Sequence, residues 1–343
     1  MRRPFLKTAA CLALGHACGF ARPSMAATSE ARDVVVVLDS GEARITLIDR
    51  TTHRIVGGFP VGKEPHHLLA TPDERAIVVA SAVGNELIFL DPGSGRRIGS
   101  HAGIDDPYQI GFSPDQRWFV VNCLRLNRVD FYRYGGGSEF HIARRLELGE
   151  LPSHMAFTAD GSKVFISLQG SNQVAAIDIA TQSVLWILDV GPAPAGVWLT
   201  PRDAVLLVAL TGSDRVVAID WRRRRIVKQI VTGEAAHNFR SAGDGRRVLL
   251  SNRIACSISL IDLAALEVVG QIRGLRPGPD DMEVSSDRRW LWTTFRFARS
   301  VGVIDLSAGQ LVDVIEVGRS PHGLFLRDRA PYYDNLPGPQ AGA

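Results

Sequence analysis

A proline recurs along the chain at a nearly constant interval, and this periodicity constrains the fold more than any other feature of the sequence. Successive positions are separated by 42, 45, 42, 42, 43 and 42 residues. The positions are Pro65, Pro107, Pro152, Pro194, Ala236 (in place of a proline), Pro279 and Pro321. A repeat of this length indicates a β-propeller or a solenoid rather than several independent domains.

Each repeat follows the same order of short strands and turns. A short apolar strand follows the proline, and a tight turn such as Ser113-Pro114-Asp115 leads into a β-branched strand. A polar loop containing Asn or Asp then precedes a third strand that ends in Ile-Asp or Leu-Asp, and a fourth strand closes the unit. Four short strands per unit are typical of a propeller blade, and no helical period persists for three turns.

The two ends of the repeat region complete each other. Residues 34–60 supply the second to fourth strands of a blade but no first strand, whereas residues 317–326 supply a first strand alone. Pairing them makes a seventh blade and leaves no exposed sheet edge. The sequence therefore predicts an all-β protein: a seven-bladed β-propeller of four-stranded blades over residues 28–330, closed by the N- and C-terminal strands, with a flexible tail over 331–343.

The repeat resembles the YVTN-type propeller repeat. The resemblance is carried by Val317-Gly318-Arg319-Ser320-Pro321-His322-Gly323 and Asn172-Gln173-Val174-Ala175-Ala176-Ile177-Asp178, and it covers about residues 34–326. It implies a periplasmic or secreted protein related to the propellers of cytochrome-type nitrite reductase and nitrous-oxide reductase. Such proteins include haem-binding enzymes and assembly factors, so the resemblance does not specify the chemistry. One unit departs from the pattern: Arg133 replaces its Asp, and the Gly-rich residues 135–138 lengthen the next turn.

Residues 1–27 have the layout of a cleavable export signal. Arg2, Arg3 and Lys7 precede the modest apolar run 9–21, and small residues follow at 24–27. The opening residues 2–7 resemble a twin-arginine signal, with an ordinary Sec leader as the alternative. Without this segment 35 basic and 36 acidic residues remain. A nearly neutral mature chain gives no electrostatic case for nucleic acid, and no further apolar stretch is long enough to span a membrane. We expect a monomer.

The two positions after the recurring proline should converge at the mouth of the central channel. At these positions the repeats carry unlike polar groups, which suits an asymmetric ligand better than a uniform scaffold. The predicted ligand-binding residues are His66, His67, Tyr108, His154, His237, Asp280, Asp281 and His322, with Arg125 and Arg296 from the upper loops. Further upper-loop arginines include Arg253.

Imidazole and carboxylate groups are the usual donors to zinc, copper, iron or a haem axial position. His66, His237 and His322 are therefore candidate ligands for a transition metal or a haem-type tetrapyrrole, and the arginines favour an anionic ligand. The structural alternative is that each histidine only bonds to neighbouring backbone.

No familiar catalytic motif is present in the sequence. The leading hypothesis is a propeller that binds a small anionic ligand or a periplasmic protein partner at its channel mouth. A tetrapyrrole- or metal-handling protein, either enzyme or cofactor-assembly factor, is the second. The third is a lactonase-like hydrolase, which would need clustered carboxylates such as Asp280 and Asp281.

Overall fold

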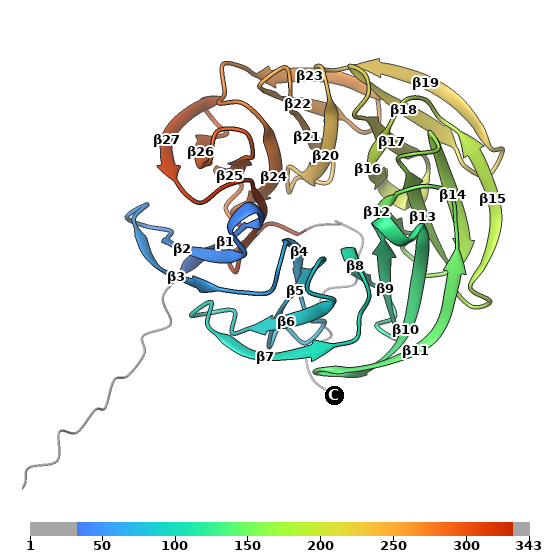
Figure 1. Cartoon of the computed structure of the whole chain (residues 1–343). Helices are drawn as coiled ribbons and strands as arrows, with labels where there is room; N and C mark the ends of the chain where they lie inside the picture. Colours follow the sequence, from blue (N-terminus) through green and yellow to red (C-terminus); the bar gives the residue numbers. More distant parts are fainter. Residues whose placement is uncertain (1–32, 332–343) are drawn as a thin grey trace, which may run out of the picture. The chain divides into compact units, whose positions relative to one another are not determined.

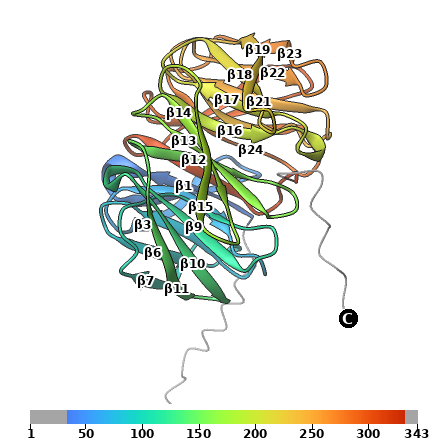
Figure 2. The same cartoon turned by 90° about the vertical axis from the view of Figure 1, so that its right-hand side faces the viewer.

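A computed structural model describes residues 33–331, and the regular structure in this range is almost entirely β-sheet. The strands form seven four-stranded antiparallel sheets, arranged as blades around a central channel (Figures 1 and 2). The predicted seven-bladed propeller is thus confirmed. The predicted export signal lies outside the described residues, as does the predicted tail beyond residue 331.

The blades are numbered from the N-terminus, and each is given from its inner strand outward. Blade 1 comprises β28 (Pro321–Leu326), β1 (Val34–Asp39), β2 (Arg44–Asp49) and β3 (Ile55–Pro60). Blade 2 comprises β4 (Pro65–Ala70), β5 (Ile77–Ser81), β6 (Glu86–Leu90) and β7 (Arg97–Ala102). Blade 3 comprises β8 (Pro107–Phe112), β9 (Trp118–Cys123), β10 (Arg128–Gly136) and β11 (Glu139–Glu147). Blade 4 comprises β12 (Pro152–Phe157), β13 (Lys163–Leu168), β14 (Gln173–Asp178) and β15 (Ser183–Asp189).

The remaining blades repeat this arrangement. Blade 5 comprises β16 (Pro194–Leu199), β17 (Leu206–Leu210), β18 (Arg215–Asp220) and β19 (Arg225–Val231). Blade 6 comprises β20 (Ala236–Ser241), β21 (Arg247–Asn252), β22 (Ser257–Asp262) and β23 (Glu267–Ile272). Blade 7 comprises β24 (Pro279–Val284), β25 (Trp290–Phe295), β26 (Ser300–Asp305) and β27 (Gln310–Glu316). Within residues 33–331 the helices are the short 3-10 turns η1 (Ser40–Glu42), η2 (Leu124–Leu126) and η3 (Pro201–Asp203), none of which could cross a membrane.

Blade 1 closes the ring as the sequence predicts. Strand β28 pairs antiparallel with β1, with Leu324 opposite Val37 and Phe325 opposite Val36. Near this closure the segment before β28 passes over the end of β1, where Gly318 N–H donates to Oδ1 of Asp39 at 3.0 Å. A Cβ on Gly318 would lie 2.6 Å from Cγ of Asp39, which explains the glycine of the repeat motif at this position.

Several polar residues of the repeat have structural roles. Asp49, at the end of the third strand of blade 1, accepts hydrogen bonds from N–H groups of the turn that follows. In blade 3, Ser113 and Asp115 likewise accept hydrogen bonds in the turn between the first and second strands. Asn172 takes a positive φ of 61° in the loop between β13 and β14, and its Oδ1 accepts the N–H of Ala193 from the next blade. These residues set turn geometry and blade spacing, and the Asn and Asp side chains suit that task because they tolerate the left-handed region and bond locally.

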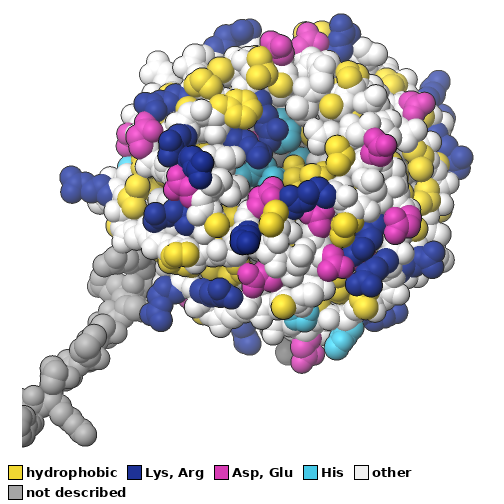
Figure 3. Space-filling view, viewed as in Figure 1, with side chains coloured by type: hydrophobic (Ala, Val, Ile, Leu, Met, Phe, Trp, Pro, Cys, Tyr) yellow, Lys and Arg dark blue, Asp and Glu magenta, His cyan; other side chains and the backbone are white. Residues whose placement is uncertain are grey.

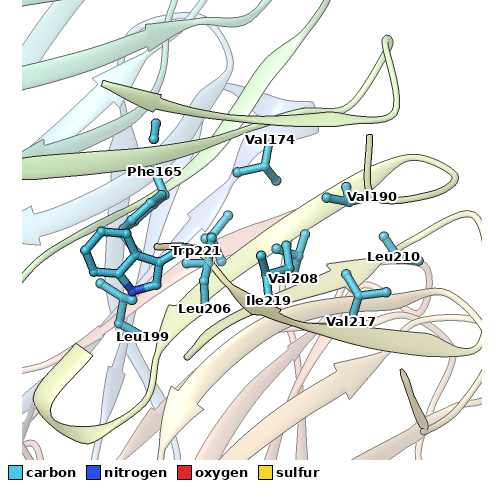
Figure 4. Close-up of a cluster of buried hydrophobic side chains, with 13 residues drawn as sticks. Phe165, Val174, Val190, Leu199, Leu206, Val208, Leu210, Val217, Ile219 and Trp221 are labelled. Carbon is cyan, nitrogen blue, oxygen red and sulfur yellow. The ribbon is translucent and has the colours of Figure 1, made fainter. Parts of the chain in front are cut away.

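The core consists of apolar layers between neighbouring blades. Figure 4 shows the layer between blades 4 and 5, where Phe165, Val208 and Trp221 pack together. Strands β13 and β17 contribute residues that are fully or almost fully buried on both faces, which matches their runs of Val, Ile, Leu and Phe. The Gly-rich insertion forms the turn of a longer hairpin in blade 3, where β10 and β11 each have nine residues.

Candidate functional site

The inner strands bring the predicted polar residues together in the channel. His66, His154, His237, Asp280 and His322 are each at most 2% exposed, and His67 and Tyr108 are also buried. Figure 3 shows histidine side chains at the bottom of a hollow near the centre of the ring. These seven residues are called the hub below. Each follows a recurring proline or its alanine replacement by one or two positions, so the repeat register places them at the same level of the channel.

The aromatic rings of the hub are in mutual contact. The ring of His66 lies between Tyr108 and His322, with centroid distances of 3.9 and 3.8 Å. His154 joins the two sides of the cluster, with its ring 5.4 Å from His67 and 5.1 Å from His237. The hub is therefore one continuous cluster rather than a set of isolated rings.

Asp280 is the charged centre of the hub. Nη2 of Arg253 lies 2.7 Å from Oδ1 and 2.8 Å from Oδ2 of Asp280, and Nη1 of Arg296 lies 3.5 Å from Oδ2. Nε2 of His237 lies 3.1 Å from Oδ1, and Nε2 of His322 lies 3.8 Å from Oδ2. Burial alone would raise the pKa of Asp280, but the positive charge of Arg253 holds it well below its usual range. Asp280 is therefore an ionised carboxylate.

The contacts of two histidines bear on which ring nitrogen carries the proton. Nδ1 of His322 lies 2.8 Å from the carbonyl oxygen of His66, which can only accept. Nδ1 of His237 lies 3.2 Å from Oγ1 of Thr211, whose own proton is donated to the carbonyl of Ala236. His322 must then be protonated at Nδ1, so its neutral ring has a lone pair on Nε2. Nε2 of His237 has a lone pair as well when the ring proton lies on Nδ1, facing Thr211.

Four Nε2 atoms of the hub are buried and have no hydrogen-bond partner among the described residues: those of His67, His154, His237 and His322. Burial lowers the pKa of these imidazoles, to about 4 for His67 and His237. The rings are accordingly neutral at physiological pH. Ligand atoms of His237, Asp280 and His322 all lie within 4.8 Å of one another, and the same holds for His66, His67 and His322.

Two predicted residues do not join the hub. Arg125 is bonded to Asp106 and Glu64 on the blade 2 and blade 3 loops. Asp281 is turned to the other side of its strand, where Oδ2 accepts the N–H of Leu324. Asp280 and Asp281 therefore have different partners: Asp280 joins the hub, and Asp281 lines the cavity described below.

Arg253 is bonded to the charged centre of the hub, although the sequence predicted it only as one of several upper-loop arginines. It directly follows β21, as Arg296 directly follows β25, so the two arginines share one register in neighbouring blades. That shared register is the signal in the sequence that could have paired them. No comparable signal marks Thr211.

The fold and the hub together define a class: a seven-bladed propeller whose channel holds a buried cluster of imidazoles around one carboxylate. The chain belongs to the YNCE-like β-propeller family, whose sequence pattern matches residues 6–332. This agrees with the propeller repeat seen in the sequence. No relative was found among the curated proteins.

Solved structures show the same fold at low sequence identity. Dihydro-haem d1 dehydrogenase NirN is 16% identical, with a TM-score of 0.66 over 87% of this chain and 76% of that chain. The periplasmic gluconolactonase PpgL of Pseudomonas aeruginosa is 17% identical, with a TM-score of 0.71 over 87% and 99%. Hydrazine synthase of Kuenenia stuttgartiensis is 17% identical, with a TM-score of 0.64 over 79% and 93%. These similarities establish the propeller fold alone, so the chemistry has to be inferred from the residues of the hub.

Proposed function

We propose that this chain is an exported, periplasmic propeller whose hub binds a transition-metal ion, with an anionic group held beside the metal. The observation that carries the proposal is that Nε2 of His237 and Nε2 of His322 both approach the carboxylate of Asp280 in a buried site, and neither nitrogen has a hydrogen-bond partner among the described residues. Lone pairs and an anionic oxygen repel one another unless a cation lies between them.

The distances suit a metal ion. Bonds of about 2.0–2.2 Å from zinc to nitrogen or oxygen place two donors of one ion about 3.0–3.5 Å apart. The observed separations of 3.1 and 3.8 Å are close to this range. Nδ1 of His322 donates to a carbonyl oxygen and Nδ1 of His237 lies 3.2 Å from the hydroxyl of Thr211, and such contacts fix the ring orientation of metal-bound histidines.

The charge of the hub suits a metal that brings an anion with it. The histidines are neutral, so Arg253 and Arg296 outweigh Asp280 by one positive charge. A divalent cation would increase this excess, and a carboxylate, phosphate or similar anion would offset it. The arginines have donors suited to such a group, because a guanidinium can bond to two oxygens at once.

Metal titration of the purified, metal-free protein tests this proposal. We expect the parent to bind about one Zn²⁺ or Cu²⁺, and His237→Ala/His322→Ala to bind at least about a hundredfold more weakly, since two of three ligands are lost. His141→Ala, which removes an exposed imidazole on β11, is the matched control and should bind like the parent. Thermal melts verify folding. Equal binding by parent and double variant, or none by either, would leave the hub as structure or as a protein-docking face.

A haem-type tetrapyrrole is the second candidate. An imidazole Nε2 can supply the axial bond and the arginines can hold acidic substituents, and the similar fold of NirN, a dihydro-haem d1 dehydrogenase, gives this candidate support. Titration with haemin should shift its Soret absorption with the parent and not with the double variant. A lactonase-like activity has less support, because it would need clustered carboxylates and Asp281 is turned away from Asp280.

A further inference from the structure

A second cavity lies on the other side of the hub, towards the end of the ring opposite the recurring prolines. It has a volume of about 690 Å³ and extends along the inner strands to their closing turns, such as Ser113–Pro114 and Thr200–Pro201. This cavity is called the funnel below. Its size is in the range of pockets that hold drug-sized molecules.

The wall of the funnel is mainly apolar. Inner strands of all seven blades line it, and large apolar side chains come from five of them: Leu69, Phe112, Met155, Phe157, Trp198 and Phe325. Phe112 and Phe157 are only partly buried although they belong to inner strands, so part of each ring is accessible. Large aromatic side chains around a concave space favour a ligand with aromatic or branched apolar groups.

Four polar residues lie together at the inner end of the funnel. His67, Gln109, Asn238 and Asp281 are each the third residue of an inner strand, and all four line the funnel at its inner end. Nδ1 of His67 lies 2.9 Å from the carbonyl oxygen of Tyr108, so its buried Nε2 is an acceptor without a partner among the described residues. Gln109 accepts the N–H of Met155 through Oε1, which leaves its amide N–H groups for a ligand.

The lining charges exclude an anionic occupant. Four carboxyl groups line the funnel, from Glu74, Asp203, Asp281 and Glu283, against one cationic side chain, Arg329. Arg329 is paired with Glu74 at 3.2 Å, and Glu283 is paired with the buried Arg240 at 2.9 Å. Asp281 accepts hydrogen bonds from Asn238 and from the N–H groups of Met282 and Leu324, so both of its carboxyl oxygens have protein partners. These features contrast with the hub, where the cations are in excess.

We propose that the funnel binds one uncharged, mainly apolar small molecule, with a hydrogen-bonding group placed against His67 and Gln109 and its apolar part against the aromatic wall. The funnel shares only His67 with the hub and uses none of His237, Asp280 and His322, and the two sites differ in polarity. It therefore does not depend on metal binding, and either proposal can fail alone.

Two fluorescent probes with one skeleton test the proposal. N-phenylnaphthylamine is uncharged and carries one N–H, whereas anilinonaphthalene sulfonate adds a negative charge. We expect the full chain to bind one molecule of the uncharged probe, with the sulfonate at least about tenfold weaker. Ala70→Trp, which places a large ring in the wall, should abolish probe binding. Val227→Trp, on the exposed surface of β19, is the matched control and should have no effect.

Two further variants test the polar contact and provide a second way to block the funnel. His67→Phe removes the acceptor at similar volume and should weaken the uncharged probe about fivefold to tenfold. If Ala70→Trp does not fold, Ala159→Trp at the exposed outer end of the funnel replaces it. No binding by the parent, equal binding of both probes, or unaltered binding by the tryptophan variants would overturn the proposal. Binding that requires removal of residues 332–343 would also overturn it, because the chain's own C-terminal segment would then be the occupant.

Discussion

Nε2 of His237 lies 3.1 Å from Oδ1 of Asp280, yet this contact does not have the geometry of a hydrogen bond. The other ring nitrogen of His237, Nδ1, lies 3.2 Å from Oγ1 of Thr211, and Nε2 keeps a lone pair when the ring proton is on Nδ1. What stabilises the carboxylate is Arg253, which lies within 2.8 Å of both oxygens. The hub thus combines a paired carboxylate with imidazole lone pairs that have no protein partner, and this combination underlies the metal-binding proposal.

Removing the partner of Asp280 should destabilise the protein strongly. Arg253→Met leaves a buried carboxylate with Arg296 alone, at 3.5 Å, and should lower the free energy of unfolding by about 3 kcal/mol. Asp280→Asn in the same chain should recover part of this loss, because no unpaired charge then remains. Urea unfolding of the two variants and the parent measures both changes. If Arg253→Met alone were as stable as the parent, Arg253 would not stabilise Asp280.

Asp39 should make stability depend on pH in a defined direction. Burial raises its pKa to about 6, against an ordinary value of 3.8, despite hydrogen bonds from Thr46 and Gly318. Because the folded state binds this proton more tightly, the stabilisation is full below about pH 4 and is lost as the pH rises through 6. The loss should be roughly 3 kcal/mol.

Asp39→Asn, which cannot ionise, isolates this contribution. Its free energy of unfolding relative to the parent should rise as the pH is raised from about 4 to 7, and urea titrations at several pH values measure the difference. A difference that stays constant across this range would show that Asp39 keeps an ordinary pKa in the folded protein.

The closure of blade 1 should be essential for stability. Leu324 is 2% exposed and packs with Val35 and Val37 of the N-terminal strand, so Leu324→Ala should cost about 3 kcal/mol through lost burial and the cavity left behind. Val312→Ala on the outer strand β27 is the control, since that side chain is 51% exposed. Thermal or urea unfolding compares the two. Equal effects would indicate that β28 contributes little to holding the ring closed.

Export can be tested directly on the expressed protein. We expect cleavage near Ala26 or Ala27, so the intact mass of periplasmic material should correspond to a chain lacking the first 26 or 27 residues. Changing Arg2 and Arg3 to Lys should block export if the twin-arginine route is used. A chain that keeps Met1 would rule out cleavage, whereas unaltered export of the lysine variant would point to the Sec route.

The sequence by itself determined the architecture. The proline period, the Asp and Asn turn positions and the split between residues 34–60 and 317–326 predicted seven blades and their closure, because each blade is built from local pairing and regular turns. It also placed His66, His237 and His322 at equivalent positions of the repeat, which lie at the same level of a closed ring.

The tertiary structure decided how those residues act. The repeat register did not show that Asp280 and Asp281 point to opposite sides of one strand, so that one joins the arginines and the other the funnel. Nor could it assign a proton to either ring nitrogen of His237, since this depends on Thr211 of the neighbouring blade. Charge pairing, tautomers and cavity walls arise between blades, from contacts that no single repeat contains, and only the assembled ring determines them.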